Sequence, residues 1–553
     1  MPKIQVSRLD LFSLAGMDDP GDERLAELLS LVKGELDSSE GDRLKLELND
    51  TNRPDLWCVE GVARALRCYH GGAEEHLSHL PETDLRIDVD GGLRDVRPFV
   101  AAFTACGWAP GEEELEALIE VQEKLAASFG RDRSTAGAGF YRLGEIEFPV
   151  SYAAAPPATS FIPLGYQEEM TLERVLEDTE TGREYAGILE GAQVYPVLRD
   201  ASGSILSFPP ILNSQTTGRV RPGDPELFCE VTGTDWETVQ LMCTILACNL
   251  QDRGAEITPV RVEYPDGSQG ITAPCPFIFR DTMTAAVEDF QRVLGTRLEP
   301  DRIADALNAM DYASVEVSGT SVTGVLPPYR RDGIHAVDMI EDVAISLGLG
   351  TFGPLLPDRF TLGRSAPIEE LADAVRLLMV GCGFEELLRP VLTSSRKLAG
   401  LTKTPAKPVA VANPMTREYG VVRNSLLPGL LEVEAASGHA AYPHRIFETG
   451  EVLLADGEGV CSTHVMLSVL VCGNTADFGD VHSVVGSLCH SRGISLKLEP
   501  VEDPRFVPGR SAAVMLDGRS SGIIGEIHPS VLEGWGITRP AAAMEILLSA
   551  LRG

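Results

Sequence analysis

The apolar residues of this chain fall into short segments, and this spacing limits what the chain can fold into more than any other feature. The longest apolar stretches, Val465–Val471 and Ala541–Leu548, are far shorter than the roughly 20 residues that span a bilayer. At roughly 100 to 200 residues per domain, a length of 553 residues predicts three or four domains. We therefore predict a multidomain protein of mixed helix and strand that does not enter a membrane.

The charged residues argue against a protein that coats nucleic acid by itself. The chain has 82 acidic and 47 basic side chains and a net charge of −35, so its long-range field repels phosphates. The acidic residues are spread over the whole chain, which is typical of a solubilising surface. The 11 cysteines include no Cys-x-x-Cys pair and lie mostly in apolar helical patterns. They predict core residues of a reduced, cytoplasmic protein.

Turn residues and changes of periodicity divide the chain into four regions. These regions are residues 1–81, 82–268, 269–352 and 353–553. The first is predicted to be helical as far as about His79. The second mixes short strands with helices such as Glu112–Phe129, and its last strand is predicted at Ile257–Tyr264. The third contains helices predicted at Asp281–Leu294 and Glu299–Met310, and the fourth mixes helix and strand.

Residues 206–254 predict a strand, a tight turn and a capped helix. Thr234 and Glu237 have the spacing of a capping box, and an apolar stripe follows until Gly254. The stripe consists of Val239, Met242, Leu246 and Leu250. Short polar side chains beside glycine are suited to hydrogen-bond a small ligand, but turns and caps use the same residues. Those side chains are Asn213, Ser214, Thr232 and Thr234. Local chemistry alone favours the structural role.

A second segment gathers acidic side chains. Asp338, Glu341 and Asp342 have the spacing that places three carboxylates on one helical face, and Asp332 can reach them from the preceding loop. Such a cluster suits a hard cation, most simply Mg²⁺ with retained waters. Asp338 with Glu341 also fits a capping pattern at a helix start. The spacing leaves metal binding and capping equally open.

Two further patterns are poor candidates for sites. Two cysteines and three histidines lie close in sequence but match no zinc-site spacing: Cys58, Cys68, His70, His76 and His79. The stretch 135–140 has a Gly-x-Gly pair but no third glycine, no lysine partner and no clear strand before it. We expect neither a zinc site nor a nucleotide site in these segments.

Taken together, four blocks in order resemble the beta subunits of phenylalanyl-tRNA synthetase, of the shorter archaeal and eukaryotic type. The first block is Asn49–Arg67, which opens with Asn-Asp-Thr-Asn-Arg-Pro-Asp. The second consists of Phe208–Ser214 and Val231–Asp235, and the third of Pro327–Asp332 and Asp338–Ala344. The fourth consists of Asn413–Tyr419, Arg423–Glu432, Ile446–Val452 and Gly525–Pro529. The resemblance covers essentially the whole chain.

The resemblance implies an α+β multidomain fold whose modules match the four regions. They are an N-terminal module (1–81), a B3/B4-like tRNA editing module (82–268), a B5-like winged-helix-type module with a magnesium site (269–352) and a B6/B7-like class II synthetase core (353–553). The last is expected to be an antiparallel sheet without an active site. The segment Ile523–Pro529 agrees, since it lacks the Gly-x-Gly-x-x-x-Arg pattern whose arginine would bind ATP. No adenylation residue is therefore assigned to this chain.

The activity implied by the resemblance is the ATP-dependent attachment of phenylalanine to tRNA(Phe). The reaction runs through an aminoacyl adenylate and releases AMP and diphosphate, in a heterotetramer of two alpha and two beta chains. Phenylalanine and ATP bind through the alpha subunit. The tRNA would be held mainly by that partner and by local arginines of this chain, namely Arg219, Arg330 and Arg331.

The resemblance also implies two sites in this chain. An apolar pocket for phenylalanine rejects a substrate with one added hydroxyl by only about a hundredfold, so a second, polar pocket is needed to hydrolyse tyrosyl-tRNA(Phe). The family's editing pocket corresponds here to Asn213, Ser214, Glu230 and Thr232. Glu230 replaces the family's usual aspartate, so the carboxylate stands on a longer stem. The family's magnesium ligands correspond to Asp332, Asp338, Glu341 and Asp342.

Two other functions fit the same residues. A free-standing tRNA-editing hydrolase would deacylate mischarged tRNA without an alpha subunit, but the negative charge argues against sufficient tRNA affinity. A noncatalytic assembly scaffold would keep only the interfaces, with Glu230 marking a decayed pocket. An editing assay on the chain alone and on the complex separates the three functions.

Overall fold

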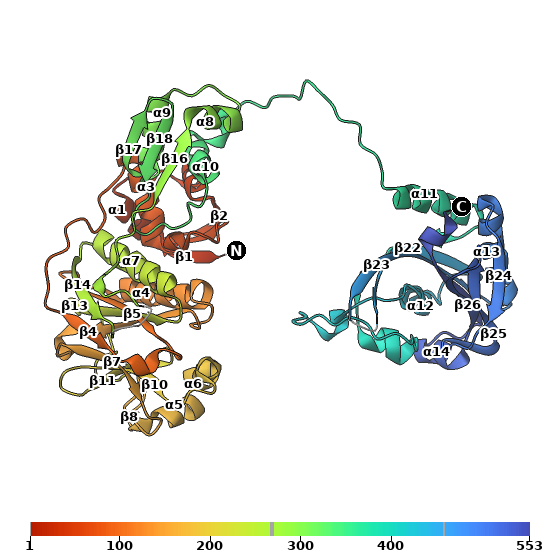
Figure 1. Cartoon of the computed structure of the whole chain (residues 1–553), viewed down its shortest axis with the longest axis horizontal. Helices are drawn as coiled ribbons and strands as arrows, with labels where there is room; N and C mark the ends of the chain where they lie inside the picture. The colour runs from red at the N-terminus through yellow and green to blue at the C-terminus, as the bar shows by residue number, and fades with distance from the viewer. Residues whose placement is uncertain (1, 266–269, 457–458, 553) are drawn as a thin grey trace. The chain divides into compact units, whose positions relative to one another are not determined.

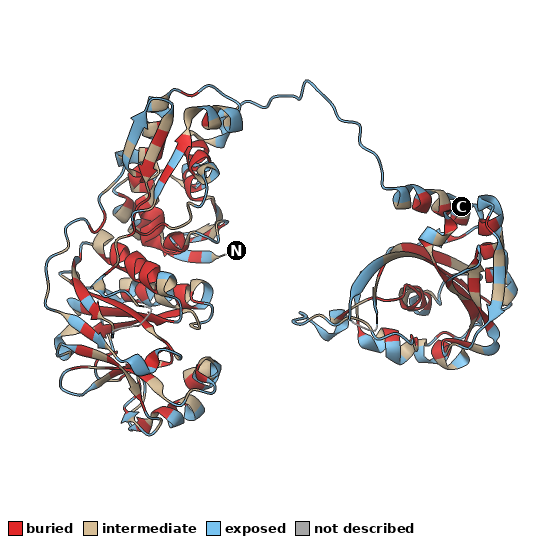
Figure 2. Cartoon of the chain, in the orientation of Figure 1, coloured by how far each residue is buried: buried red, intermediate tan, exposed pale blue. Residues whose placement is uncertain are grey.

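The computed structural model describes residues 2–265, 270–456 and 459–552, and it divides into two compact units, Met1–Leu356 and Pro357–Gly553 (Figure 1). The predicted boundary at residues 268 and 269 lies outside the described residues. Residues 353–367 are exposed throughout (Figure 2). In the part of the chain that is described, no helix is both long and apolar enough to span a membrane.

The first region is not wholly helical, so the prediction of helix as far as His79 is wrong. Its helices are α1 (Arg8–Ala15), α2 (Asp22–Leu29) and α3 (Val59–Gly71), and its strands are β1 (Lys3–Ser7), β2 (Gly34–Glu40) and β3 (Arg43–Leu48). The strands form an antiparallel sheet in the order β1-β3-β2. Ile4 pairs with Leu46 and Val6 with Leu44, and all four side chains are buried. Apolar residues at every second position bury one face of a sheet, and this period of two indicates strand.

The second region is built around a ten-stranded sheet in the order β12-β11-β10-β7-β4-β14-β5-β13-β6, with β15 paired to β14. Its main strands are β4 (Arg86–Val89), β5 (Phe99–Cys106), β6 (Ala136–Arg142), β7 (Val150–Ala155), β10 (Tyr195–Arg199), β11 (Ile205–Phe208), β12 (Leu212–Asn213), β13 (Glu226–Gly233), β14 (Glu256–Glu263) and β15 (Ala273–Cys275). A two-stranded ribbon, β8 (Ser160–Phe161) with β9 (Met170–Thr171), stands apart from this sheet. The helices are α4 (Glu112–Lys124), α5 (Leu172–Asp178), α6 (Glu180–Tyr185) and α7 (Trp236–Asp252).

Helix α7 lies on β5 and β13 and confirms the predicted stripe, since Val239, Met242, Leu246 and Leu250 are fully buried. The predicted capping box is wrong. The N-cap residue is Asp235, whose carboxylate accepts a hydrogen bond from the backbone N–H of Thr238 at 2.8 Å. Thr234 instead donates its hydroxyl to the Ser134 carbonyl at 3.1 Å. Asp caps a helix as well as Thr does, so the sequence pattern alone misplaced the start by one residue.

The third region packs three helices against a small antiparallel sheet. The elements are β16 (Thr282–Ala286), α8 (Val287–Leu294), α9 (Pro300–Ala309), β17 (Ala313–Ser318), β18 (Ser321–Val325) and α10 (Ala336–Leu347). The predicted helix at Asp281–Leu294 begins only at Val287, because the preceding residues pair with β18 in the sheet. Met283 and Ala285 are buried there while Thr282 and Thr284 are exposed, so pairing across the sheet outweighs local helix preference.

The second unit is a seven-stranded sheet in the order β19-β22-β23-β27-β26-β25-β24, antiparallel except for the β19–β22 pair. Its sheet strands are β19 (Glu385–Glu386), β22 (His444–Ala455), β23 (Cys461–Cys472), β24 (Leu496–Pro500), β25 (Phe506–Leu516), β26 (Arg519–Ile527) and β27 (Ala541–Leu547). A separate ribbon pairs β20 (Leu392–Thr393) with β21 (Val421–Val422), and the helices are α11 (Pro367–Gly381), α12 (Leu427–Ala436), α13 (Phe478–Arg492) and α14 (Pro529–Trp535).

Helices cover both faces of this sheet, which explains why its central strands carry apolar residues at consecutive positions. On β23, Leu467, Val469 and Val471 join a core with α11 and α13, while Leu470 and Cys472 join a core with α12 and α14. A strand buried on both faces needs apolar residues at consecutive positions. The run Val465–Val471 is therefore a central strand (Figure 2).

Candidate functional site

The candidate editing pocket is centred on one face of β13. Glu230 and Thr232 are two residues apart, so their side chains point to the same side of the sheet. Across the ladder to β6, Glu230 lies opposite Gly139 and Thr232 lies opposite Gly137. The Gly-x-Gly pair belongs to a strand, and other side chains of the protein occupy the space that its missing side chains leave beside the two polar residues.

Glu230 and Asn213 meet through a residue that the sequence analysis missed. The Tyr141 hydroxyl donates to Glu230 Oε1 at 2.8 Å and lies 3.2 Å from Asn213 Oδ1. The Asn213 amide donates in turn to the Phe140 carbonyl at 3.4 Å. Tyr141 and Glu230 are both buried. The alternation of Gly137, Gly139 and Tyr141 along one strand is the signal that could have revealed this contact.

Thr232 is held by a second residue absent from the prediction, Arg97. Its Nε donates to Thr232 Oγ1 at 3.0 Å, and a terminal nitrogen donates to the Thr232 carbonyl at 2.5 Å. Arg97 is fully buried, and desolvation lowers the pKa of its guanidinium to about 10. The structure separates Ser214 from this group, because its hydroxyl pairs with the Thr217 hydroxyl at 2.7 Å. Glu230 and Asn213 therefore share one hydrogen-bond network through Tyr141, whereas Thr232 belongs to a separate one with Arg97.

The Glu230 carboxyl is placed in an environment that favours its neutral form. Burial raises its pKa from 4.5 to about 7, against the lowering effects of the Tyr141 hydrogen bond and the Arg97 charge. Its second oxygen, Oε2, is buried and has no hydrogen-bond partner among the described residues. A hydroxyl group that reached this oxygen would satisfy it.

This raised pKa predicts a loss of stability as the pH rises. Below pH of about 4.5 the carboxyl is protonated in both the folded and the unfolded chain, and the stabilisation is complete. Between about 4.5 and 7 only the unfolded chain ionises freely, so the free energy of unfolding should fall by up to about 3 kcal/mol. Urea unfolding of Glu230→Gln should lack this change. Glu226→Gln, on the exposed end of the same strand, should keep it.

The four predicted metal ligands line one small cavity of about 30 Å³. Asp332 and Asp342 are almost fully buried there, while Glu341 is about half exposed. Asp50 of the first region contributes a fifth carboxylate to the cavity wall. The helical spacing therefore did bring these side chains together.

Each of these carboxylates is contacted either by a positively charged side chain or by backbone N–H groups. Arg330 donates to Asp332 at 3.0 and 2.7 Å and to Asp342 at 2.9 Å. Burial would raise the pKa of Asp332, but Arg330 and Arg53 lower it to about 2. The backbone N–H groups of Ile334 and His335 both donate to Asp338, and Glu341 pairs with Lys33 at 3.0 Å.

The helix cap differs from the predicted pattern. His335 is the N-cap residue of α10 and Asp338 is its capping-box partner, while Glu341 plays no part in the cap. Asp338 therefore has a structural role whether or not a cation binds.

The arginines predicted to contact tRNA differ in exposure. Arg330 is buried in the acidic cluster, so the prediction that it binds phosphate is wrong. Arg331 pairs with Asp281 at 2.6 Å and stacks over the Phe279 ring. Arg219 is exposed. Burial within an ion-pair network is a tertiary property that the sequence does not display.

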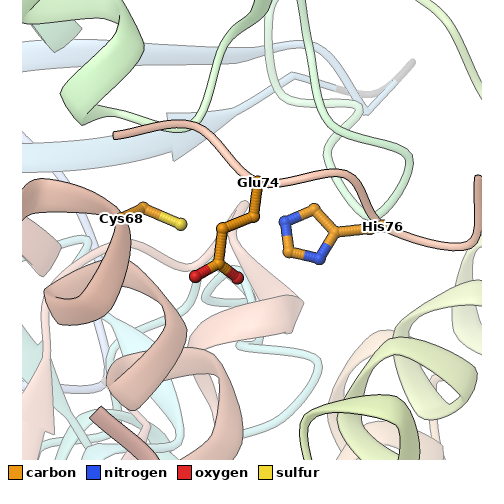
Figure 3. Close-up of side chains that lie close together, drawn as sticks. All are labelled: Cys68, Glu74 and His76. Atoms are coloured by element: carbon orange, nitrogen blue, oxygen red, sulfur yellow. The ribbon is translucent and has the colours of Figure 1, made fainter. Parts of the chain in front are cut away.

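One cluster was not expected from sequence spacing. Cys68, Glu74 and His76 approach one another so that one possible ligand atom from each lies within 4.8 Å of the others (Figure 3). Two of these three side chains already have partners, since Arg67 donates twice to Glu74 and His76 Nε2 lies 2.7 Å from Asp311. The His76 contact joins the first region to the loop that follows α9. The arrangement is that of a packed polar junction.

Three cationic side chains of the second unit line one small cavity, and each of them is paired with a carboxylate. That cavity of about 80 Å³ is lined by Arg389, Lys397 and Arg423. Arg423 pairs with the buried Glu448 at 2.7 Å, and the other two both pair with Glu432. Cations that are neutralised within the protein are poorly placed to bind the phosphates of ATP.

Comparison with known proteins identifies the family. A model described as "tRNA synthetase B5 domain" matches residues 283–349, and one described as "Phenylalanyl tRNA synthetase beta chain CLM domain" matches residues 355–548. The phenylalanine–tRNA ligase beta subunit of Borrelia garinii is 36% identical over 100% of this chain and 99% of its own. That of Pyrococcus furiosus is also 36% identical, over 100% of both chains.

A solved structure agrees with these relatives. An N-terminal fragment of the Pyrococcus horikoshii phenylalanyl-tRNA synthetase beta subunit matches 63% of this chain and 99% of its own, with 36% identity and a TM-score of 0.59. Relatives that span the whole chain at more than a third identity share its fold. The chain therefore belongs to the family of phenylalanine–tRNA ligase beta subunits and is a subunit of an aminoacyl-tRNA synthetase.

Proposed function

We propose that this chain acts with an alpha subunit, as two alpha and two beta chains, to attach phenylalanine to tRNA(Phe) with ATP. The observation that carries the proposal is the match to beta subunits over the full length of the chain. The paired cations of the second unit support placing adenylate formation on the alpha subunit. Phenylalanine, ATP and most of the tRNA contacts would then belong to that partner.

Co-expression with a candidate alpha chain tests this proposal. The two chains should purify together with the mass of a heterotetramer and should charge tRNA(Phe) with phenylalanine. A chain that stays alone and yet deacylates mischarged tRNA would favour the free-standing hydrolase. A complex that charges tRNA but clears no mischarged tRNA would favour the scaffold.

The second region is proposed to hydrolyse tyrosyl-tRNA(Phe). The support is the buried carboxyl of Glu230, which lies opposite Gly139 on the adjacent strand. A tyrosyl hydroxyl can donate to a carboxylate, whereas a phenylalanyl ring offers no donor. A phenylalanyl group would leave the buried carboxylate unpaired, so the site should discriminate strongly against it. Thr232, fixed by Arg97, would position the neighbouring backbone.

The acidic cavity is proposed to bind one Mg²⁺ in a structural role. Its chemistry fits the ion, because oxygen ligands surround a space that holds about one or two waters. The five carboxylates face three cations, Lys33, Arg53 and Arg330, so negative charge is in excess. Asp332, Asp338, Glu341 and Asp342 would hold the cation between the first and third regions. Neutralising this excess would stabilise the junction.

The expected result is a magnesium-dependent gain in stability that Glu341→Gln abolishes. A ligand at 100 times its dissociation constant adds about 2.7 kcal/mol to the free energy of unfolding. Glu341 lies outside the helix cap, so its loss should remove the Mg²⁺ response and spare the fold. Glu288→Gln, an exposed carboxylate on α8, should keep the full response. Crystals soaked in Mn²⁺ that show no anomalous peak between the four carboxylates would contradict the site.

A further inference from the structure

The editing pocket already contains a phenol that belongs to the chain itself. Tyr141 points its hydroxyl between Glu230 Oε1 and Asn213 Oδ1, at 2.8 and 3.2 Å. These are two of the polar groups that would read the hydroxyl of a tyrosyl substrate. The Tyr141 side chain is completely buried, so it fills the position and does not merely border it.

The backbone explains how Tyr141 reaches this position. Tyr141 lies opposite Phe228 on β13, two residue pairs along the ladder from the Glu230–Gly139 pair and on the same face of the sheet. The ring leans along the strand over Gly139 and packs against Phe228, with the ring centres 5.7 Å apart. A Cβ atom on Gly139 would lie 2.6 Å from the Tyr141 hydroxyl and 3.0 Å from Glu230 Oε1. Glycine at 139 is therefore what admits the phenol to the carboxylate.

The longer stem of Glu230 matches this arrangement. The carboxylate on β13 meets a hydroxyl that comes from the adjacent strand, and only one of its two oxygens is used. The other, Oε2, is buried without a hydrogen-bond partner among the residues described. The site thus holds the phenol of Tyr141. It also keeps one unpaired carboxyl oxygen, Glu230 Oε2, which could accept a hydrogen bond from a second phenol.

From these contacts we propose that Tyr141 is an internal phenol that competes with the tyrosyl group of a substrate for Glu230 and Asn213. The proposal rests on the proposed editing function. A tyrosyl substrate binds only in the fraction of molecules whose Tyr141 has turned out of the site. The apparent affinity for tyrosyl-tRNA(Phe) is then reduced by that fraction.

The first test asks what binds in the space that Tyr141 leaves. In the full chain, Tyr141→Ala should create a cavity that takes p-cresol, the phenol of a tyrosine side chain, about tenfold or more tighter than toluene, which lacks the hydroxyl. Calorimetry and the p-cresol-dependent shift of the unfolding temperature measure this ratio. Tyr141→Phe keeps the ring in place and should bind neither compound. Adding Glu230→Leu to Tyr141→Ala should bring the ratio close to one.

A folded Tyr141→Ala protein that binds neither compound, or both equally, overturns the proposal. Removing a buried aromatic ring destabilises a core, so Tyr141→Val provides a second variant whose β-branched side chain suits a strand. It should show the same preference for p-cresol in its smaller cavity. A preference for toluene in either variant likewise overturns the proposal.

The second test separates this proposal from the proposed function. In the complex with an alpha subunit, Tyr141→Ala should lower the KM for hydrolysis of tyrosyl-tRNA(Phe) about threefold or more and leave kcat near wild type. If no version of the complex hydrolyses the substrate while p-cresol binding is selective, the editing function fails and the phenol site stands. If the wild type hydrolyses it and Tyr141→Ala shows no selectivity, the editing function stands and the role of Tyr141 fails.

Discussion

Purified without a partner, the chain should catalyse no phenylalanine-dependent exchange of pyrophosphate into ATP. The second unit lacks the Gly-x-Gly-x-x-x-Arg pattern at Ile523–Pro529, and the cations Arg389, Lys397 and Arg423 are neutralised by carboxylates of the same unit. No free cation of this group remains for the triphosphate. Adding an alpha subunit should raise exchange from background to roughly 1 per second or more, in the range usual for enzymes.

The measurement needs a preparation free of the host's alpha subunit, which mass spectrometry can verify. Isotopic exchange is then followed for each subunit alone and for the mixture. An informative control is the mixture with Arg423→Lys in the beta chain. Its exchange should persist wherever the complex forms, because Arg423 is assigned a structural pairing with Glu448. Robust exchange by the pure beta chain would refute the assignment of adenylate formation to the alpha subunit.

The second large effect concerns editing. In the complex, Glu230→Ala or Thr232→Ala should slow hydrolysis of tyrosyl-tRNA(Phe) by about tenfold or more and leave phenylalanine charging near wild type. Removing the Glu230 carboxylate leaves the buried tyrosyl hydroxyl of the substrate without its acceptor, which costs about 1 to 3 kcal/mol. Removing the Thr232 hydroxyl leaves the buried Arg97 Nε without its partner at 3.0 Å. Deacylation and charging rates measured on one preparation separate the two activities.

Two further variants sharpen this experiment. Glu230→Asp keeps a carboxylate, so it should retain editing. Ser214→Ala should have a smaller effect than Glu230→Ala, because Ser214 pairs with Thr217 and not with the Glu230 network. If the wild-type complex clears tyrosyl-tRNA(Phe) no faster than it decays spontaneously, the pocket assignment is wrong and the scaffold function gains support.

Much of the fold was predicted correctly from the periodicity of the apolar residues. The stripe on α7, the strand β14 and the helix α9 lie within a residue or two of their predicted positions, because each buries one continuous face with apolar residues at the matching period. The errors occurred where a segment's partner is distant in sequence. Residues 282–286 form a strand only because β18 lies beside them, and the sheet of the first region depends on β3 in the same way.

The same distinction between local and distant contacts applies to the candidate sites. Spacing along one helix was sufficient to group Asp338, Glu341 and Asp342, since a helix fixes the distances between its own residues. The sequence by itself thus determined the family and this acidic cluster. Only the tertiary structure decided that Arg330 is buried and that Tyr141 meets Glu230, residues 89 positions apart. Such contacts depend on the register between strands, which no local pattern encodes.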